Sequence, residues 1–373
     1  MNIAVDAFPL MVGTASGIPN YVRNTLLRLL AIDRENQYFL YCRNPFKFED
    51  YNNLAKRFST YATDTSSSYG NTLWLFSQGV RLMRRDKIDI FWGTRQMLPP
   101  YLPGGIKKVL VSYDLVWHYF PETMETYNRL VSSVFFRRSI KSSDHIITIS
   151  EASARSLRDV LEVEPDKISI AYPAADYCPL DKDGSAKYIS EKYGTQKEYI
   201  LTVGTVEPRK NLSFLMTAIS GLRGKGYQLL IAGASGWKTS ALHSEYERLG
   251  LTEKEVKFLG YIPDCDMNRL YSGARLFLFP SVYEGFGIPP LEAMASGTPV
   301  IASNASSLPE VTGNPQIQLS PHDIEGWRDM IVNVMSDSEL QNRMIVHGLE
   351  RNKLFSWEES ARRTLKVFED VFK

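Results

Sequence analysis

Two glutamates, Glu284 and Glu292, enclose the loop sequence GFGIPPL in the second half of the chain. Carboxylates accept hydrogen bonds from pairs of hydroxyl groups, which sugars and riboses supply. Glycines let the backbone approach a ligand, and a helix that begins with Pro presents free N–H groups to phosphate. The pattern indicates a sugar-nucleotide site, with Glu292 on the ribose, pyrophosphate at the helix start and Glu284 on the hexose. The alternative is a solvated loop acid and a helix-surface acid.

The elements around this loop must place both acids at one edge of a sheet. ARLFLFPS predicts a buried strand, and PPLEAMAS predicts a short helix that ends at Gly297 in the left-handed region. The loop is then a strand-to-helix turn at the carboxyl end of a parallel sheet, where open α/β folds bind ligands.

The same alternation of a short apolar run and a longer amphipathic segment recurs along the whole chain, as βαβ units require. It predicts an α/β fold with two Rossmann-like, doubly wound domains. We expect domain boundaries at residues 1–175 and 185–355, and a final helix at 356–373 that packs back on the first domain. The predicted strands are NIAVDAF, YFLYCR, IDIFWG, KVLVSYD and HIITIS in the first half, and YILTVG, YQLLIAG, VKFLG, RLFLFPS and PVIAS in the second.

The composition of the 373-residue chain narrows the class of protein. The net charge of +1 argues against a nucleic-acid binder, although residues 1–150 hold 18 Lys and Arg against 12 Asp and Glu. The three cysteines form no C-x-x-C pair, which fits a reducing compartment and gives no metal site. The start reads as a strand, and no apolar run reaches the roughly 18 residues of a membrane span. We expect a cytoplasmic protein, with peripheral contact to an anionic membrane left open.

The run FPSVYEGFGIPPLEAMASGTPVIAS resembles the E-x7-E signature of the retaining GT-B glycosyltransferases of family 4. VGTVEPRKNLSFLMTAI, HIITISEASARSLRD, SLPEVTGN and FSWEESA follow that family's order and spacing, and the chain is most similar to bacterial mannosyltransferase-like members. The resemblance implies two domains facing a central cleft. It also implies transfer of a hexose from a nucleotide diphosphate sugar to a glycan or polyprenyl-linked acceptor, without a cofactor or a metal. GDP-mannose is the first choice of donor, and UDP-hexoses are the alternative.

The resemblance also assigns roles to single residues. Arg209 and Lys210 of EPRKN are expected to hold the donor diphosphate, while Thr205 stands where many members have Arg. Tyr113 replaces the usual His of a His-Asp pair, so either Tyr113 and Asp114 line the site or His118 serves instead. The expected catalytic residues are Glu284, Lys210, Arg209, Asp114 and Tyr113. The expected donor-binding residues are Glu292, Gly285, Phe286, Gly287, Ile288, Gly17, Gly204 and Gly233.

Two other sequence features, and the function itself, have competing interpretations. The DCD sequence at 264–266 suggests a metal site, but Asp264 is better interpreted as a helix N-cap. The basic stretches RLMRRDK and FFRRSIKS would suit either anionic lipid or a solvated helix face. An epimerase or phosphorylase of the same fold, or a non-catalytic subunit, is the rival to a transferase.

Overall fold

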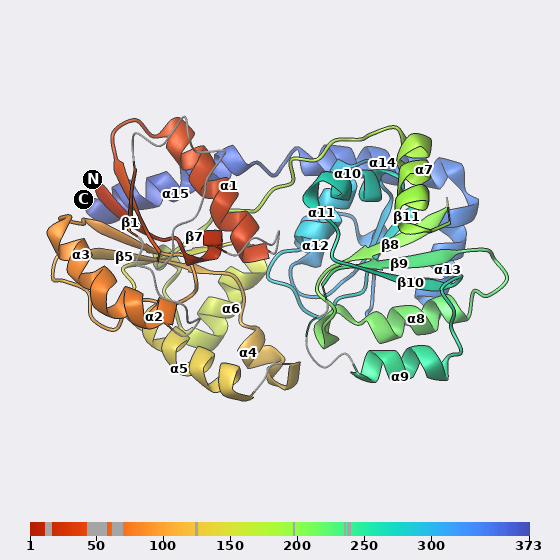
Figure 1. The fold of residues 1–373 in the computed structure, drawn as a ribbon, viewed down its shortest axis with the longest axis horizontal. Helices are drawn as coiled ribbons and strands as arrows, with labels where there is room; N and C mark the ends of the chain where they lie inside the picture. Colours follow the sequence, from red (N-terminus) through yellow and green to blue (C-terminus); the bar gives the residue numbers. More distant parts are fainter. Residues whose placement is uncertain are drawn as a thin grey trace. The chain divides into compact units, whose positions relative to one another are not determined.

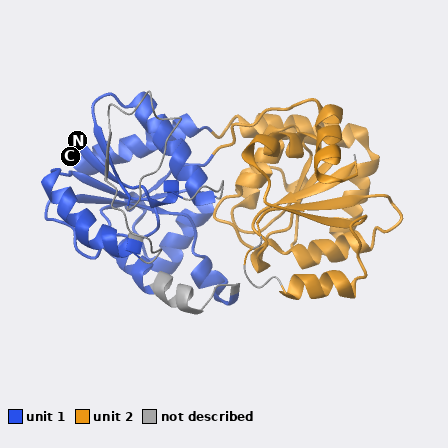
Figure 2. Cartoon of the chain, in the orientation of Figure 1, with its two compact units in different colours: residues 1–173, 356–373 blue, residues 174–355 orange. Residues whose placement is uncertain are grey.

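The computed structural model describes residues 1–11, 17–42, 58–61, 70–123, 126–196, 198–234, 236 and 240–373. The chain forms two compact units, which Figure 2 shows in different colours. Met1–Pro173 and Ser356–Lys373 make the first unit, and Ala174–Phe355 make the second.

The first unit contains a parallel sheet in the order β3-β2-β1-β4-β5-β6-β7. All five strands predicted in this half are confirmed, while the short strands β3 and β7 were not predicted. The strands are β1 (Asn2–Asp6), β2 (Gln37–Tyr41), β3 (Phe58–Tyr61), β4 (Ile90–Gly93), β5 (Lys107–Ser112), β6 (His145–Thr148) and β7 (Ile168–Ile170).

Helices cover both faces of this sheet (Figure 1). They are α1 (Gly17–Ile32), α2 (Gly70–Trp74), α3 (Val80–Arg85), α4 (Val116–Tyr119), α5 (Thr126–Ser142), α6 (Glu151–Leu161) and α15 (Trp357–Phe372). The final helix, α15, packs against α1 and against β5, β6 and β7. Its start is fixed by Ser356, whose hydroxyl accepts the N–H of Glu359 at 3.4 Å, and its buried face carries Trp357 and Phe368.

The second unit contains a parallel sheet in the order β10-β9-β8-β11-β12-β13. The five predicted strands are again confirmed, and only β13 was not predicted. Figure 1 shows α8 and α9 on one face of this sheet and α7, α10 and α11 on the other. The strands are β8 (Tyr199–Val203), β9 (Gln228–Ala232), β10 (Val256–Gly260), β11 (Leu276–Phe279), β12 (Val300–Ser303) and β13 (Gln318–Leu319). The helices are α7 (Lys182–Tyr193), α8 (Leu212–Ser220), α9 (Ser240–Arg248), α10 (Asp264–Ser272), α11 (Ile288–Ala295), α12 (Leu308–Thr312), α13 (Ile324–Ser336) and α14 (Ser338–Asn352).

Each sheet has a point where the strand order reverses, between β1 and β4 in the first unit and between β8 and β11 in the second. Loops that leave neighbouring strands at such a point diverge and leave room for a ligand. In the second unit these are the loops that carry Arg209 and Lys210 after β8 and Glu284 after β11. The α/β fold predicted from the sequence is therefore confirmed, and it brings these residues together.

Candidate active site

Glu284 lies in the loop after β11 and is held by two cations. Its Oε1 lies 2.6 Å from Nζ of Lys210, and its Oε2 lies 2.7 Å from Nη1 of Arg209. Glu284 is 7% exposed and Lys210 is 8% exposed. Glu284 is therefore not the solvated loop acid that the sequence left as an alternative.

The two cations decide the charge of this buried carboxylate. Burial by itself would raise the pKa of Glu284, but the charges of Arg209 and Lys210 outweigh that effect and lower the pKa to about 2. Burial lowers the pKa of Lys210, and the neighbouring Glu284 opposes that shift. Glu284 is consequently ionised at physiological pH, and both of its oxygens are engaged.

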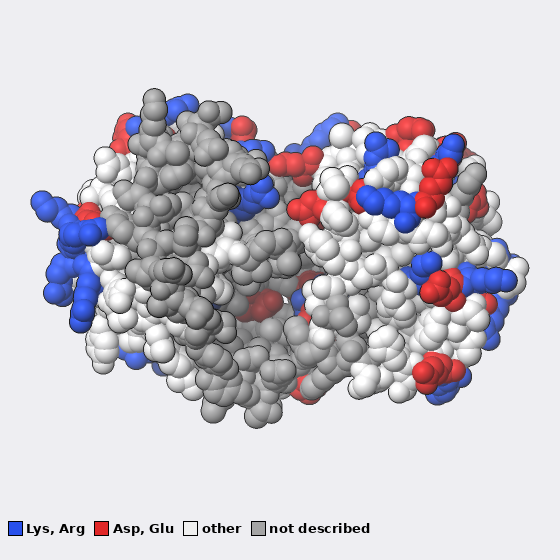
Figure 3. Space-filling view, viewed as in Figure 1, with Lys and Arg blue, Asp and Glu red and all other residues white. Residues whose placement is uncertain are grey.

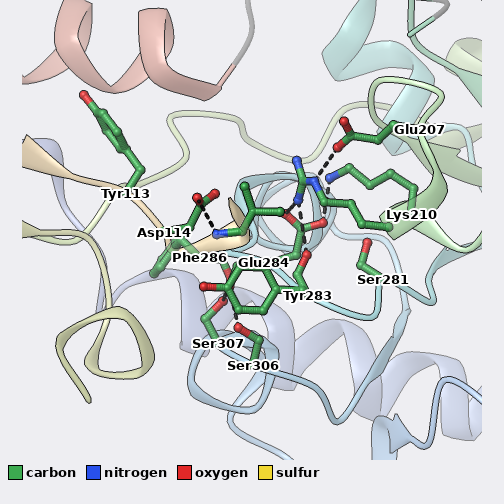
Figure 4. Close-up of polar contacts among 12 residues, drawn as sticks. Tyr113, Asp114, Glu207, Lys210, Ser281, Tyr283, Glu284, Phe286, Ser306 and Ser307 are labelled. Carbon is green, nitrogen blue, oxygen red and sulfur yellow. Dashed lines mark hydrogen bonds and ion pairs between the residues drawn. The ribbon is translucent and has the colours of Figure 1, made fainter. Parts of the chain in front are cut away.

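Glu207 completes the cluster and was not singled out from the sequence. It is buried, and its Oε1 forms an ion pair with Nε of Arg209. Burial raises the pKa of Glu207 against the opposing charges of Arg209 and Lys210. Two acids and two basic side chains thus form one group of ion pairs, of which Figure 4 labels Glu207, Lys210 and Glu284. The only sequence signal was an acid two residues before the predicted Arg209.

Local backbone structure brings the two loops together. Pro208–Lys210 form a single 3-10 turn, and Asn211 follows in the left-handed region with φ 58°. Nδ2 of Asn211 donates to the carbonyl of Pro280 at 3.3 Å, and N–H of Val282 donates to the carbonyl of Arg209 at 2.9 Å. The cations are therefore fixed to the loop that carries Glu284 by its backbone as well as by its carboxylate.

Glu292 lies on α11 and is only partly buried. Its Oε2 accepts the hydroxyl of Tyr271 at 2.8 Å. Burial raises the pKa of Glu292 to about 7, although the Tyr271 hydrogen bond acts in the opposite direction, and Asp264 adds to the rise. This acid is therefore not the freely solvated helix-surface acid of the alternative, and its charge changes close to neutral pH.

The start of α11 offers fewer free N–H groups than an ordinary helix start. Pro289 and Pro290 occupy its first turn and have no N–H, so Ile288 and Leu291 supply the donors of that turn. Gly287 precedes the helix with φ 120°, and a Cβ there would lie 2.7 Å from Cδ2 of Leu308. This position therefore requires glycine.

Residues 187–351 match the family described as "Glycosyl transferases group 1", and residues 15–177 match "Glycosyltransferase Family 4". The chain is 31% identical over 274 residues to O-antigen chain mannosyltransferase B of Escherichia coli, covering 72% of each chain. The chain belongs to the GT-B glycosyltransferases.

One further relative and one solved structure are similar to this glycosyltransferase. It is 30% identical over 237 residues to serotype-specific mannosyltransferase WbdA of Escherichia coli, a match that covers 61% of the chain and 29% of the longer protein. Sucrose-phosphate synthase from Thermosynechococcus elongatus has the same fold, with a TM-score of 0.76, 19% identity and coverage of 100% and 99%. Among the described residues of the glycosyltransferase, no helix is both long and apolar enough to span a membrane.

Tyr113 of the glycosyltransferase lies in the core of the first unit and is 5% exposed. Its hydroxyl donates to the carbonyl of Thr94 at 2.9 Å, and its N–H donates to Oε1 of Gln96 at 2.9 Å. Burial raises its pKa well above the usual value, and nearby Tyr21 and Asp6 add to the rise. The buried hydroxyl of Tyr113 already donates its hydrogen to the carbonyl of Thr94, so it stabilises the backbone there.

The neighbours of Tyr113 are more accessible. Asp114 is half-buried, and its Oδ1 accepts the N–H of Val116 at 3.2 Å. His118 is exposed on α4, with the rings of Trp117 and Tyr119 at 5.8 and 5.0 Å. The exposed His118 therefore lies beside two aromatic rings, those of its neighbours in the sequence.

The glycine-rich segment before α1 is described only in part. Gly17 is the first residue of α1 and is exposed, with nothing within 4 Å of a Cβ built on it. Residues 12–16 of the same segment lie outside the described residues.

Gly204 and Gly233 follow β8 and β9 and lie against each other. Their φ angles are 153° and 150°, and a Cβ on Gly233 would overlap the carbonyl oxygen of Gly204. N–H of Gly204 also donates to the carbonyl of Ala232 at 2.9 Å. Close packing of two backbones therefore requires Gly233, independently of any ligand.

The interpretation of Asp264 as a helix N-cap is wrong. Asp264 is the first residue of α10, Pro263 occupies the cap position, and no side chain caps the helix. Asp266, the second acid of DCD, accepts from Nζ of Lys192 at 2.7 Å and from the hydroxyl of Tyr188 at 2.9 Å. This acid therefore joins α7 to α10.

Proposed function

We propose that the glycosyltransferase transfers a hexose, with retention of configuration, from a nucleotide diphosphate sugar to a sugar hydroxyl of a growing polysaccharide or lipid-linked glycan. The observation that carries the proposal is the buried group formed by Arg209, Lys210 and Glu284 at the strand-order reversal of the second unit. Mannose from GDP-mannose is the first choice of donor, because relatives with about 30% identity are named mannosyltransferases.

The proposed roles of the cations follow from the charge that the reaction creates. Breaking the bond between the sugar and its phosphate builds negative charge on the leaving oxygen. Fixed cations in a site that excludes water stabilise this charge without having to reorganise. Lys210 is nearly buried and Arg209 is held by Glu207 and Glu284, so both are oriented before the donor arrives.

Glu284 suits a positioning role better than that of a nucleophile. Its lowered pKa makes it a weak base, and each of its oxygens already contacts a cation. We therefore propose a same-face substitution. The bond from the anomeric carbon to the phosphate oxygen breaks, the bond to the acceptor oxygen forms on the same face, and the acceptor proton passes to the leaving phosphate.

The remaining donor contacts are proposed from the loop and helix that follow Glu284. Glu292 would accept ribose hydroxyls, and the backbone of Gly285, Phe286, Gly287 and Ile288 would contact the phosphate and the hexose. Gly17, Gly204 and Gly233 are kept as donor-binding positions by resemblance. Gly233 also has the structural requirement given above.

In the first unit we propose Asp114 as the residue that lines the site. The half-buried carboxylate of Asp114 is more accessible than the hydroxyl of Tyr113. Tyr113 is therefore assigned the role of supporting this segment through the carbonyl of Thr94.

The first test is a panel of GDP-, UDP- and ADP-sugars, with thermal shift for binding and labelled-sugar release for turnover. Glu292→Ala and Lys210→Ala should abolish both signals with the donor that the wild type uses. Lys353→Ala is the matched control, because Lys353 is exposed and forms its ion pair with the exposed Glu350, at 2.6 Å. Nucleotide binding without any turnover would instead favour a non-catalytic subunit.

Peripheral contact with an anionic membrane is proposed for the face of the first unit that carries α3. Arg81, Arg84, Arg85 and Lys87 are all exposed, and Figure 3 shows basic side chains standing out over this part of the unit. Clustered Lys and Arg side chains attract anionic lipid. A solvated helix face is the alternative, and co-sedimentation with anionic and zwitterionic vesicles distinguishes the two.

A further inference from the structure

Two serines in the loop between β12 and α12 bind the loop that carries Glu284. The hydroxyl of Ser306 donates to the carbonyl of Glu284 at 2.6 Å, and that of Ser307 lies 2.6 Å from the carbonyl of Phe286. Ser307 is also 2.9 Å from the carbonyl of Glu284. A hydroxyl has one hydrogen to donate, so the pair of serines suits the pair of carbonyls.

Neither serine is in the arrangement that is usual for its position in the chain. Ser306 has φ 54°, in the left-handed region that is uncommon for residues other than glycine. Ser307 occupies the N-cap position of α12, but its hydroxyl makes no capping bond there. Strained backbone such as that of Ser306 clusters at functional sites, and here the hydroxyls of both serines bind carbonyls of the neighbouring loop.

The two hydrogen bonds fix the orientation of two peptide planes. In a trans peptide the C=O and the following N–H point in opposite directions. Holding the carbonyls of Glu284 and Phe286 therefore turns the N–H groups of Gly285 and Gly287 to the opposite side of the loop. Figure 4 shows Ser306 and Ser307 on one side of Glu284 and Lys210 on the other.

A third serine, Ser303, orients a peptide in the same way, and here the partners of both the C=O and the N–H of that peptide are present in the structure. The hydroxyl of Ser303 donates to the carbonyl of Ser281 at 2.5 Å, and the N–H of Val282, in the same peptide, donates to the carbonyl of Arg209 at 2.9 Å. The serine on one side thus aims an N–H at a partner on the other.

We propose that Ser306 and Ser307 are positioning residues that aim the N–H groups of Gly285 and Gly287 at oxygen atoms of the bound donor. These oxygens belong either to the diphosphate or to the hexose. The inference rests on the proposed function, because it needs a nucleotide diphosphate sugar in this site. Ser306 and Ser307 would then contribute to donor affinity without contacting the donor themselves.

The test compares the wild type with a Ser306→Gly, Ser307→Ala double variant by calorimetric titration with GMP, GDP and GDP-mannose, or with the uridine series if the wild type binds that instead. Glycine adopts the backbone angle at 306 without strain, so this substitution removes the hydroxyl without straining the loop. The Kd for the monophosphate should not change. The Kd for the full donor should rise by about 5- to 30-fold, the equivalent of one or two hydrogen bonds.

The GDP arm identifies the oxygen that is bound. A rise that already appears with GDP assigns the N–H groups to the diphosphate, and a rise that appears only with GDP-mannose assigns them to the hexose.

Ser190→Ala is the matched control, because its hydroxyl also donates to a backbone carbonyl of the second unit, that of Thr195 at 2.7 Å, which is not part of the loop that carries Glu284. It should lower the melting temperature without changing the ratio of the donor and monophosphate Kd values. The proposal is wrong if the double variant leaves this ratio unchanged, or if Ser190→Ala shifts it equally. A wild type that binds no nucleotide sugar refutes the proposed function and this inference together.

Discussion

Replacing Glu284 with glutamine should destabilise the second unit strongly at neutral pH. The carboxylate is 7% exposed and contacts Lys210 and Arg209 at 2.6 and 2.7 Å. Removing one partner of a buried ion pair leaves an uncompensated charge, which costs about 3–5 kcal/mol. The fall of the pKa from 4.5 to about 2 gives a similar figure of about 3 kcal/mol, at roughly 1.4 kcal/mol per pKa unit.

The same shift fixes how the effect depends on pH. The folded pKa of Glu284 lies below the unfolded pKa, so its contribution to stability is complete above about pH 4.5 and is lost as the pH falls toward about 2. The glutamine variant lacks this contribution at every pH. The difference in unfolding free energy between wild type and variant should therefore be constant from pH 7 to 5 and should shrink below about pH 4.5.

Calorimetric melting across this pH range measures the difference. For a cost of about 3 kcal/mol, the melting temperature of the second unit at pH 7 should fall by about 6–12 °C, at about 2–4 °C per kcal/mol for a unit of this size. Glu350→Gln removes an exposed ion pair with Lys353 and should change stability by less than about 1 kcal/mol. A Glu284→Gln protein as stable as the wild type at pH 7, or a difference that grows in acid, would refute the reasoning.

Three further predictions concern binding, backbone strain and the membrane. Donor affinity should fall as the pH drops from about 8 to about 6, because the pKa of Glu292 is raised to about 7 and only the ionised acid accepts both ribose hydroxyls. In a Glu292→Gln variant the donor Kd should not depend on pH over this range. Gly287→Ala should lower the unfolding free energy by about 1–3 kcal/mol in thermal melts, because φ is 120° there, whereas Gly17→Ala should be neutral or slightly stabilising. Co-sedimentation with vesicles containing anionic lipid should decrease in an Arg81→Glu, Arg84→Glu variant, because both side chains are exposed on α3.

Each of these has a result that would contradict it. Affinity that is independent of pH in the wild type would remove Glu292 from ribose binding. An alanine at 287 without any change in melting temperature would mean that the loop adjusts to a side chain. Equal sedimentation with anionic and zwitterionic vesicles would favour the solvated helix face.

Most of the fold could be predicted from the sequence because buried parallel strands leave an apolar signal that needs no partner to be recognised. All residues of β4, β11 and β12 are buried, and each strand was predicted. The three strands that were missed are β3, β7 and β13, with four, three and two residues. They lie at the ends of their sheets, where short runs beside one neighbour carry little periodicity.

The sequence predicted the residues of the candidate site better than the contacts between them. The E-x7-E pattern and EPRKN identified Glu284, Glu292, Arg209 and Lys210. That one glutamate binds both cations depends on strand order, which places β8 beside β11 although 74 residues separate Lys210 from Glu284. No local pattern specifies such a contact.

The sequence by itself determined the class of fold, the family and the residue types at the site, because each of these can be recognised from local periodicity and motif spacing. Only the tertiary structure decided how those residues are used. Burial and partner charges set the pKa of Glu284 low and that of Glu292 high, although the two acids have the same side chain. Tyr113 became a core residue for the same reason, because solvation and hydrogen-bond partners are properties of packed neighbours and not of the residue type.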